Sequence, residues 1–295
     1  MNTKEFRYYS FILLISFIGF SCRKEIPVDV PNSQPKIVIS SIIEKDENIS
    51  ANLFISSNAI DEHETSNFLN NASVFVYENN ILVDTMEFFG DGNYRSADVI
   101  GELGNEYKLI VAATNFDTII GKTTLVDFVS INSFDTVRRG KDMNGFLIMY
   151  CDVKFSDPSA EKNYYRLKII DNPEKDFNIV YSQSNDPIIE YAHWNGIYYF
   201  TDALFQGKEY SFSIQLDNYY SANSDEEETQ YSNNVYVILE NMSEDYYYFS
   251  KSVSAQYDVD GFGFFAQAVI VYNNIENGFG IVGSKGISTK PLGEN

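Results

Sequence analysis

The sequence is poor in the residues that build disulfide scaffolds and metal sites. It contains two cysteines and two histidines among 295 residues. Two cysteines cannot form a disulfide framework, and two histidines leave little for a metal centre. Basic residues are also scarce, because 21 lysines and arginines face 42 aspartates and glutamates, which leaves a formal net charge of −21. Phosphate backbones and anionic lipids attract cationic surfaces, so this balance argues against nucleic acid and against adsorption to a membrane through a polybasic face.

The chain is instead rich in apolar residues and aromatic rings. Its 295 residues are enough for about two ordinary domains. Hydrophobic residues make up 44% and aromatic residues 16%, including 22 tyrosines and 23 phenylalanines. Such a composition is typical of packed domains and not of disordered tails.

Residues 1–21 are predicted to be a signal peptide. Lys4 and Arg7 form a short basic head, and an uncharged, mostly apolar run follows from Tyr8 to Phe20. This order of segments is the layout of a signal peptide. The run has 13 residues, whereas about 20 are needed to cross a bilayer as a helix.

Cys22 is the predicted lipid anchor. The small residue before it, Ser21, resembles the end of a bacterial lipobox, although Gly19 stands where leucine is usual. Several acyl chains would anchor Cys22 durably, since each buried methylene contributes about 0.8 kcal/mol. The alternative is an ordinary signal peptide followed by a chance cysteine. If Cys22 is acylated, Cys151 is the only thiol left, and its apolar neighbours in the sequence predict a buried small hydrophobe.

The mature chain is predicted to be mainly β, with two tandem antiparallel β-sandwich domains of the Ig-like type. Residues 22–35 contain three prolines and predict an extended linker. Short runs rich in β-branched and aromatic residues follow, at a spacing that suits antiparallel sandwiches. We place the first domain at residues 36–126 and the second, β-rich domain at residues 127–295.

A short internal sequence repeat, which we call the internal echo, supports the presence of two domains. Residues 104–109 (GNEYKL) recur as residues 207–212 (GKEYSF). In β-sandwiches a turn glycine often leads into a strand whose tyrosine bonds back to the preceding loop, so we expect this arrangement in both domains. A match this short also arises by coincidence. Asn79-Asn80, between two β-type runs, predicts a tight hairpin turn because asparagine tolerates positive φ.

One α-helix is expected near the C-terminus of the second domain, at about residues 243–256. Ser243 can cap its N-terminus, and acidic residues follow in the first turn, where they suit the helix dipole. Tyr246, Phe249 and Val253 recur at a spacing of three to four residues, which predicts the face that packs on a sheet.

Three patterns that suggest chemistry do not have the context that the chemistry needs. Residues 278–283 match GxGxxG, but the 12 residues that follow leave no room for a helix and a second strand, so a tight turn or close backbone approach is expected in place of nucleotide binding. Residues 258–261 resemble the start of a calcium loop, but Gln267 stands where that loop needs glutamate, so a turn is expected. His63 and His193 have no partners at ligand spacing and are expected to be solvated. No catalytic residue, metal site or cofactor is predicted.

Aromatic rings beside turns and three Asp-Thr pairs are the candidate surface sites. Exposed tyrosine and tryptophan offer large, rigid contact areas to a protein or a glycan, and the alternative is partial burial at sheet edges. The candidate contact residues are Trp194, Tyr198, Tyr199, Tyr219 and Tyr220. Thr85, Thr118 and Thr136 each stand between an aspartate and an apolar residue, which resembles the O-glycosylation signal of Bacteroidota envelope proteins. So short a pattern also arises by chance.

Several short segments, spread over nearly the whole mature chain, together carry a family resemblance. They are Ser21-Cys22 and residues 35–39 (PKIVI), 71–78 (NASVFVYE), 91–94 (DGNY), 104–109 (GNEYKL), 155–158 (FSDP), 163–167 (NYYRL) and 271–283 (VYNNIENGFGIVG). Together they resemble a Bacteroidota outer-membrane lipoprotein family known as domain of unknown function 4249. The resemblance implies lipid anchoring at the outer membrane. The acids that route such lipoproteins to the cell surface are reduced here to Lys24-Glu25, so the cell-surface and the periplasmic face both stay open.

The resemblance also implies a non-enzymatic protein, often associated with a TonB-dependent outer-membrane transporter. The leading expectation is an accessory subunit that docks on such a barrel and helps to capture or present its ligand. Its expected partners are outer-membrane lipid, through acylated Cys22, and the transporter. The alternatives are a structural envelope protein, either an adhesin or an assembly scaffold, and, third, a glycan-active enzyme.

Overall fold

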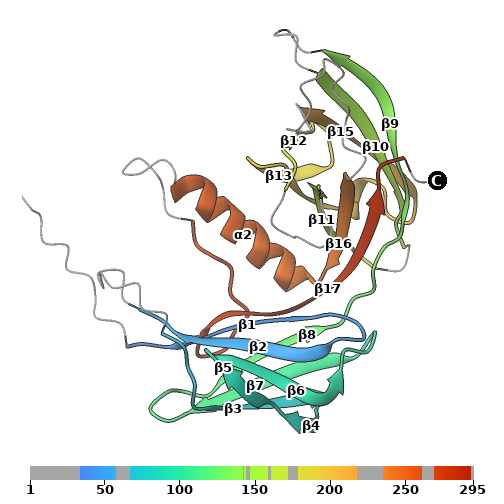
Figure 1. The fold of residues 1–295 in the computed structure, drawn as a ribbon. Coiled ribbons are helices and arrows are strands. Elements are labelled where there is room, and N and C mark those ends of the chain that lie inside the picture. Colours follow the sequence, from blue (N-terminus) through green and yellow to red (C-terminus); the bar gives the residue numbers. More distant parts are fainter. Residues whose placement is uncertain are drawn as a thin grey trace, which may run out of the picture. The chain divides into compact units, whose positions relative to one another are not determined.

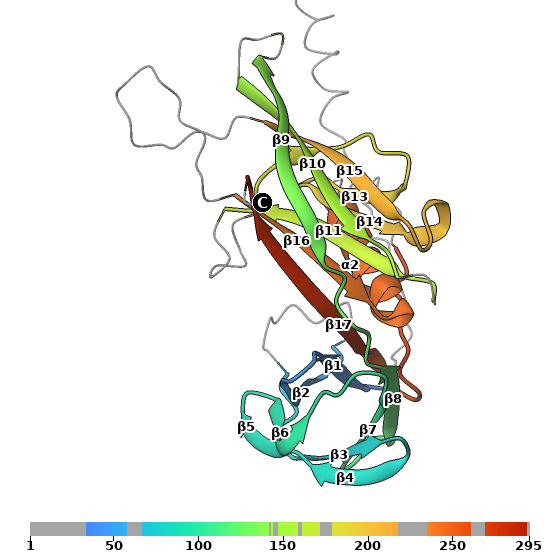
Figure 2. The ribbon, with the colours of Figure 1, turned by 90° about the vertical axis from the view of Figure 1, so that its right-hand side faces the viewer.

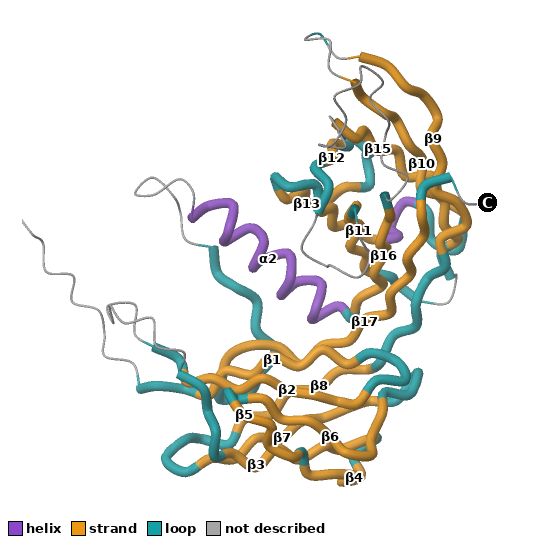
Figure 3. Tube along the Cα trace, viewed as in Figure 1, coloured by secondary structure: helices purple, strands orange, loops and turns teal. Residues whose placement is uncertain are grey.

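The computed structural model describes residues 34–57, 67–141, 143, 147–158, 161–171, 179–217, 235–260 and 269–293. Strands dominate these ranges, and one α-helix, α2, lies among them (Figures 1 and 3). The prediction of a mainly β chain with one packed helix is confirmed. The elements are β1 (Ile37–Ile43), β2 (Asn48–Ile55), β3 (Ala72–Glu78), β4 (Ile81–Thr85), β5 (Glu87–Gly90), β6 (Asn93–Ile100), β7 (Glu106–Ala113), β8 (Ile119–Thr124), β9 (Ile131–Lys141), β10 (Leu147–Ser156), β11 (Tyr164–Ile170), β12 (Ser182–Gln183), β13 (Ile189–His193), β14 (Ile197–Thr201), the 3-10 helix η1 (Asp202–Leu204), β15 (Glu209–Asp217), β16 (Tyr236–Met242), α2 (Glu244–Asp260) and β17 (Phe279–Pro291).

The strands up to β8 enclose a first core. A four-stranded antiparallel sheet, in the order β4-β3-β7-β8, faces the strands β17-β1-β2-β6-β5 of a nine-stranded sheet. Alternate residues of both sheets are buried in one cluster, with Ile39 and Leu53 from one side and Val74 and Leu109 from the other. This alternation is what two sheets produce when each turns one face inward.

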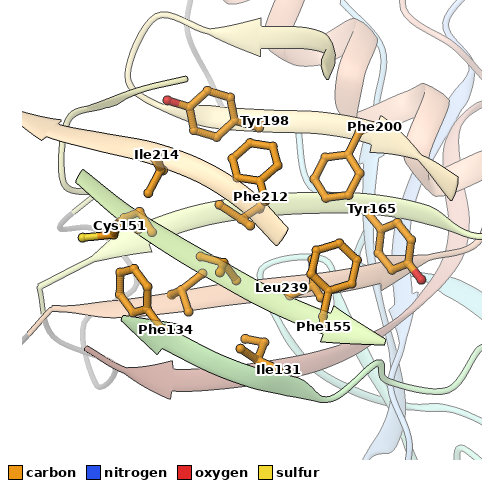
Figure 4. Packing of buried hydrophobic residues seen from close by; sticks show 14 of the residues in the cluster. Ile131, Phe134, Cys151, Phe155, Tyr165, Tyr198, Phe200, Phe212, Ile214 and Leu239 are labelled. Atoms are coloured by element: carbon orange, nitrogen blue, oxygen red, sulfur yellow. The ribbon is translucent and has the colours of Figure 1, made fainter. Parts of the chain in front are cut away.

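The later strands enclose a second core that is dominated by aromatic rings. A second four-stranded sheet, β12-β15-β10-β9, packs against β11, β14 and β16 of the nine-stranded sheet. Figure 4 shows Phe155, Tyr165, Phe200 and Phe212 gathered between them. Ring centroids lie 5.5 Å apart in the pairs Phe155–Tyr165 and Phe200–Phe212, a favourable aromatic distance. Cys151 is buried here at 1% exposure, which confirms its prediction as a small core residue.

β17 pairs with strands of both halves of the nine-stranded sheet. Residues 279–284 pair in parallel with β1, and residues 285–291 pair antiparallel with β16, so one strand joins the two halves of the nine-stranded sheet (Figure 2). Val282 is fully buried in the first core. The first core therefore includes residues from far beyond the domain boundary expected at 126/127. Parallel pairing with a distant strand leaves no local pattern in the sequence, so the boundary could not show it.

Glycines let β17 lie against its neighbours. Gly280 has a φ of +112°, and a Cβ there would lie 1.9 Å from the carbonyl oxygen of Ile39 on β1. A Cβ at Gly283 would lie 2.6 Å from the Cβ of Tyr246 on α2. Real Cβ atoms do not come so close, so the prediction that this GxGxxG pattern serves close backbone approach is confirmed.

The two copies of the internal echo differ in how their tyrosines bond. The glycine that opens each copy has a positive φ, as a tight turn requires. In the first copy the Tyr107 hydroxyl accepts a hydrogen bond from the Glu102 N–H at 2.9 Å, so the ring locks onto the preceding loop as expected. In the second copy the Tyr210 hydroxyl donates to Asp186 at 2.6 Å. The tyrosine lock is therefore confirmed for the first copy alone.

α2 lies on the nine-stranded sheet, on the face turned away from the second core. Its fully buried residues are Tyr247, Ser250 and Ser254, one position further along than the expected face, which begins at Tyr246. The serines face inward because they have a partner there. The buried Tyr199 hydroxyl lies 3.0 Å from Ser250 Oγ and 2.8 Å from Ser254 Oγ.

The C-terminal end of α2 replaces an expected turn. Asp258 and Asp260 lie within the helix, so the turn predicted for this segment is wrong. The Tyr191 hydroxyl donates to Asp258, and His193 Nε2 lies 3.5 Å from the same carboxylate. The His193 side chain is only 9% exposed, so its prediction as solvated is also wrong. His63 lies outside the described residues.

Candidate functional site

The structure separates the aromatic residues that were predicted as contacts. Trp194, in the turn between β13 and β14, is 71% exposed. Tyr198 and Tyr199 are 2% and 1% exposed, so the prediction is wrong for these two. β14 is covered on both faces, because Tyr198 packs in the second core and Tyr199 beneath α2. Tyr219 and Tyr220 lie outside the described residues.

The predicted modification sites are spread over different elements. Thr85 is exposed at the end of β4, and Thr118 is exposed just before β8. Thr136 is half-buried on β9, where its hydroxyl lies 3.3 Å from Met149 Sδ. Cys22 lies outside the described residues. Glycosylation and acylation therefore stay predictions.

Carboxylates accept hydrogen bonds from buried tyrosine hydroxyls in this protein. The Tyr165 hydroxyl donates to Asp157 at 2.5 Å, and that of Tyr247 donates to Glu190 at 3.0 Å. Burial, followed by the neighbouring carboxylate, raises the pKa of both tyrosines.

Over the described ranges, no group of three or more His, Cys, Asp or Glu residues is placed to hold a metal ion. Nor does this part of the chain contain a helix long and apolar enough to cross a membrane.

One exposed surface of the first sheet pair is apolar. β4 and β5 are the edge strands of the two facing sheets, and Met86 alone separates them in the sequence. Residues 81–90 therefore run along one sheet edge and then along the other, and we call them the edge segment. Met86 is 6% exposed and fixes this segment to the first core. Five large apolar side chains of the edge segment, which we call the edge patch, are exposed: Ile81 (69%), Leu82 (51%), Val83 (38%), Phe88 (46%) and Phe89 (65%).

The chain reaches this edge through a tight turn. Asn79 and Asn80 both adopt positive φ, 48° and 67°, and join β3 to β4, so the predicted hairpin turn is confirmed. β4 pairs with β3, and β5 pairs with β6. Within the described ranges no strand pairs with the other edge of either one, although the Ser96 hydroxyl on β6 donates to Asp84 on β4.

Sequence reasoning missed the edge patch, although a signal was present. A half-buried strand alternates apolar and polar residues, whereas Ile81, Leu82 and Val83 are three apolar residues in a row, and Phe88 and Phe89 are adjacent. The edge segment also contains neither lysine nor proline, the residues that commonly protect an exposed sheet edge.

A groove of about 960 Å³ lies beside the N-terminus of α2. Phe128, which is 48% exposed, and Tyr164 give its lining an aromatic surface. Asn163 and Thr123 also line it, and each has a buried side-chain oxygen without a hydrogen-bond partner among the described residues. The Tyr164 hydroxyl donates to Glu244 of the helix. The groove thus combines aromatic surface with hydrogen-bonding oxygens.

A buried ion-pair network fixes α2 to the sheet. Glu240, 1% exposed, accepts a hydrogen bond from Arg166 Nε, while Lys168 and Lys285 lie 4.0 and 3.8 Å from its second oxygen. Arg166 also donates to Ser250 Oγ of the helix at 2.6 Å. Burial raises the pKa of Glu240, but the positive charge of Arg166, followed by the two lysines, outweighs it and lowers the pKa to about 2. The network is packed within the molecule and has a structural role.

These features define a mainly β protein with one helix packed on a sheet. The chain belongs to the family described as Domain of unknown function (DUF4249), whose model matches residues 23–290. No curated protein matches the sequence. Among solved structures, a crystal structure from Corynebacterium diphtheriae, described as a membrane anchored protein, matches with a TM-score of 0.21 and 9% identity. That match covers 70% of this chain and 54% of the other, so this chain spans about half the length of that protein.

Proposed function

We propose that this protein is a non-enzymatic, lipid-anchored accessory subunit of a TonB-dependent transporter at the outer membrane of a Bacteroidota cell. The observation that carries the proposal is the edge patch, in which five large apolar side chains are exposed on two neighbouring sheet edges. Contiguous apolar surface on a folded domain is a common mark of a protein-binding site. An unpaired strand edge is, in addition, a surface that another polypeptide can cover.

The anchoring part of the proposal is supported by the start of the chain. The family match begins at residue 23, directly after the predicted acylated residue Cys22. Two tandem Ig-like sandwiches are also part of the proposal. The two buried clusters support them, and β17 pairs with strands of both halves of the sheet that links them.

The groove beside α2 supports a role in ligand capture. The exposed Phe128 ring offers a face on which a sugar ring can stack, and the polar residues Asn163 and Thr123 line the same groove. A glycan segment presented to the transporter is the ligand class that fits these groups. Phe128→Ala should weaken binding in an array of glycans, while Trp194→Ala, a change at another exposed ring, should leave it unchanged. Equal binding by wild type and Phe128→Ala would count against the groove.

Purification from the native envelope tests the proposed function. The full-length protein, labelled in cells with a palmitate analogue, is captured from detergent-solubilised envelopes. We expect a labelled protein that brings a TonB-dependent transporter with it, and a Cys22→Ser variant that is unlabelled and released in soluble form. Capture of the labelled protein without a transporter contradicts the accessory role. Binding to host or matrix surfaces in that case favours the structural alternative.

A further inference from the structure

We propose that the edge patch holds its partner by strand addition, in which an extended apolar segment of the partner protein pairs with the free edge of β4. The inference rests on the proposed function, because it states how the partner is held. The partner segment that we infer has apolar side chains in the middle and lysine or arginine at its ends.

The orientation of neighbouring side chains on β4 favours a strand over a flat contact. Successive residues of a strand point to opposite faces of the sheet. Ile81 and Leu82 are consecutive, yet they are 69% and 51% exposed. A partner packed on one face of the sheet would cover only one of them. A strand laid beside β4 contacts side chains on both faces and pairs with the free backbone groups as well.

The next strand extends this surface. Phe88 and Phe89 on β5 are again consecutive and exposed. The Phe88 ring is braced by the buried Tyr94 ring, with centroids 5.2 Å apart. Phe89 lines a hollow of about 580 Å³ together with Arg95. A segment that pairs with β4 therefore has further apolar surface beside it for its flanking side chains.

Three other sheet edges in the described part of the chain, those formed by β8, β9 and β12, are protected. β8, the far edge of the same sheet, is covered by Glu276, whose N–H donates to the Ile120 carbonyl at 2.8 Å. β9 carries Arg138, Arg139 and Lys141 on the edge of its sheet. β12 has two residues only. Covering, basic side chains and shortness are recognised ways of blocking edge pairing, and β4, which is five residues long, has no lysine or arginine and no covering strand among the described residues.

Charge decides between a second copy of this chain and a different protein. The edge segment contains the acids Asp84 and Glu87 and no basic residue, and the whole chain carries −21. Two copies therefore repel each other, whereas a partner segment with basic ends is attracted. The occupant inferred here is consequently a basic-ended apolar strand of another protein.

A double variant tests strand addition within the purification described above. Ile81→Lys combined with Leu82→Lys places on β4 the charge that protects β9, at two exposed positions outside the core. Val137→Lys, at a 62% exposed valine on β9, is the matched control. We expect wild type and Val137→Lys to recover equal amounts of transporter and the double variant to recover about tenfold less. Circular dichroism and melting temperature close to wild type confirm that the double variant is folded.

A peptide probe separates failure of strand addition from failure of the proposed function. The probe is a synthetic peptide of five alternating valines and threonines with two lysines at each end, added to the purified full-length protein. Hydrogen exchange of the backbone amides at residues 81–85 should slow in wild type and not in the double variant, while amides of β8 stay unchanged. Transporter recovery that is equal in wild type and double variant overturns strand addition and leaves the proposed function standing. If no transporter is recovered, the proposed function fails, and unchanged exchange with the probe then overturns strand addition as well. A dimer of wild type that the double variant abolishes, seen by light scattering, overturns the choice of occupant.

Discussion

At the scale of single residues, Glu240 is a buried carboxylate around which this acidic chain places three of its few basic residues. Its carboxylate is 1% exposed, and Arg166, Lys168 and Lys285 surround it. Burying an ion pair costs desolvation free energy, and the attraction between the charges offsets this cost only when every charge keeps its partner. Removal of one partner should therefore harm the fold far more than removal of an exposed charge.

Replacement of Glu240 by glutamine tests this role. Glu240→Gln leaves the Arg166 guanidinium buried without a counter-charge, so we expect a loss of about 3–5 kcal/mol in the free energy of unfolding. Glu106→Gln is the control, because Glu106 lies 4.0 Å from Lys122 at the surface and its loss should cost less than about 1 kcal/mol. Urea denaturation at neutral pH measures both. Equal losses in the two variants would refute the structural role.

The same residue sets a dependence of stability on pH. The pKa of Glu240 is lowered from 4.5 to about 2 in the folded protein. A carboxyl whose folded pKa is depressed stabilises the protein above its unfolded pKa and loses this contribution as pH falls through the folded one. The difference in unfolding free energy between wild type and Glu240→Gln should therefore be constant above about pH 5 and shrink toward pH 2. A difference that stays constant over this range would contradict the assignment.

Single residues also show where sequence reasoning succeeds and fails. Cys151 was placed in a core correctly because its neighbours along the chain are apolar. Tyr198 and Tyr199 stand beside a turn and are candidate contacts, with partial burial as the alternative, and β14 is in fact covered by the second core on one face and by α2 on the other. Burial on both faces depends on elements that are distant in the sequence, so local pattern could not reveal it.

At the scale of elements, local signals predicted turns and close contacts but not their partners. The Asn79-Asn80 turn and the helix were both expected from the sequence and are present. The glycines of β17 predicted close approach, yet the strand that approaches is β1, from the other end of the chain. The edge patch was missed for the same reason, because an edge is defined by the order of strands in a sheet.

Gly280→Ala tests the close approach of β17 to β1. The new methyl group would overlap the Ile39 carbonyl oxygen and would also force a side chain into a positive φ, so we expect a loss of about 3 kcal/mol or more. Gly104→Ala isolates the second effect, since Gly104 has a φ of +79° and open space around its Cα, and it should cost about 1 kcal/mol. Chemical denaturation compares the two. Similar losses in both variants would show that β17 has room to move.

At the scale of the whole molecule, one strand joins the two halves of the nine-stranded sheet, and among the described residues the edges of β4 and β5 carry exposed apolar side chains. The mainly β class and the presence of one helix could be predicted from composition and periodicity. The shared strand could not, because it depends on pairing between residues 37–43 and residues 279–284. Lipid anchoring is predicted from the leader and the family resemblance, and it concerns residues that the structure does not describe.

A count of free thiols in the protein purified from its native cells tests whether Cys22 is acylated. Cys151 is 1% exposed, and burial raises its pKa to about 12, so it should not react with a thiol reagent at pH 8 in the native protein. After denaturation we expect one reactive thiol per chain if Cys22 is acylated. The Cys151→Ser variant, purified in the same way, should then show none. Two reactive thiols per chain in the denatured protein from native cells would mean that Cys22 is present and free.

The most direct test of the central claim is photo-crosslinking in the cells that make the protein. A photoreactive amino acid replaces Leu82 in the edge patch or, as a control, Val137 on the protected edge of β9. The account predicts that irradiation joins position 82, and not position 137, to an extended segment of a TonB-dependent transporter, identified by mass spectrometry of the crosslinked peptides. Crosslinks to no envelope protein at position 82, or the same products at both positions, would contradict it.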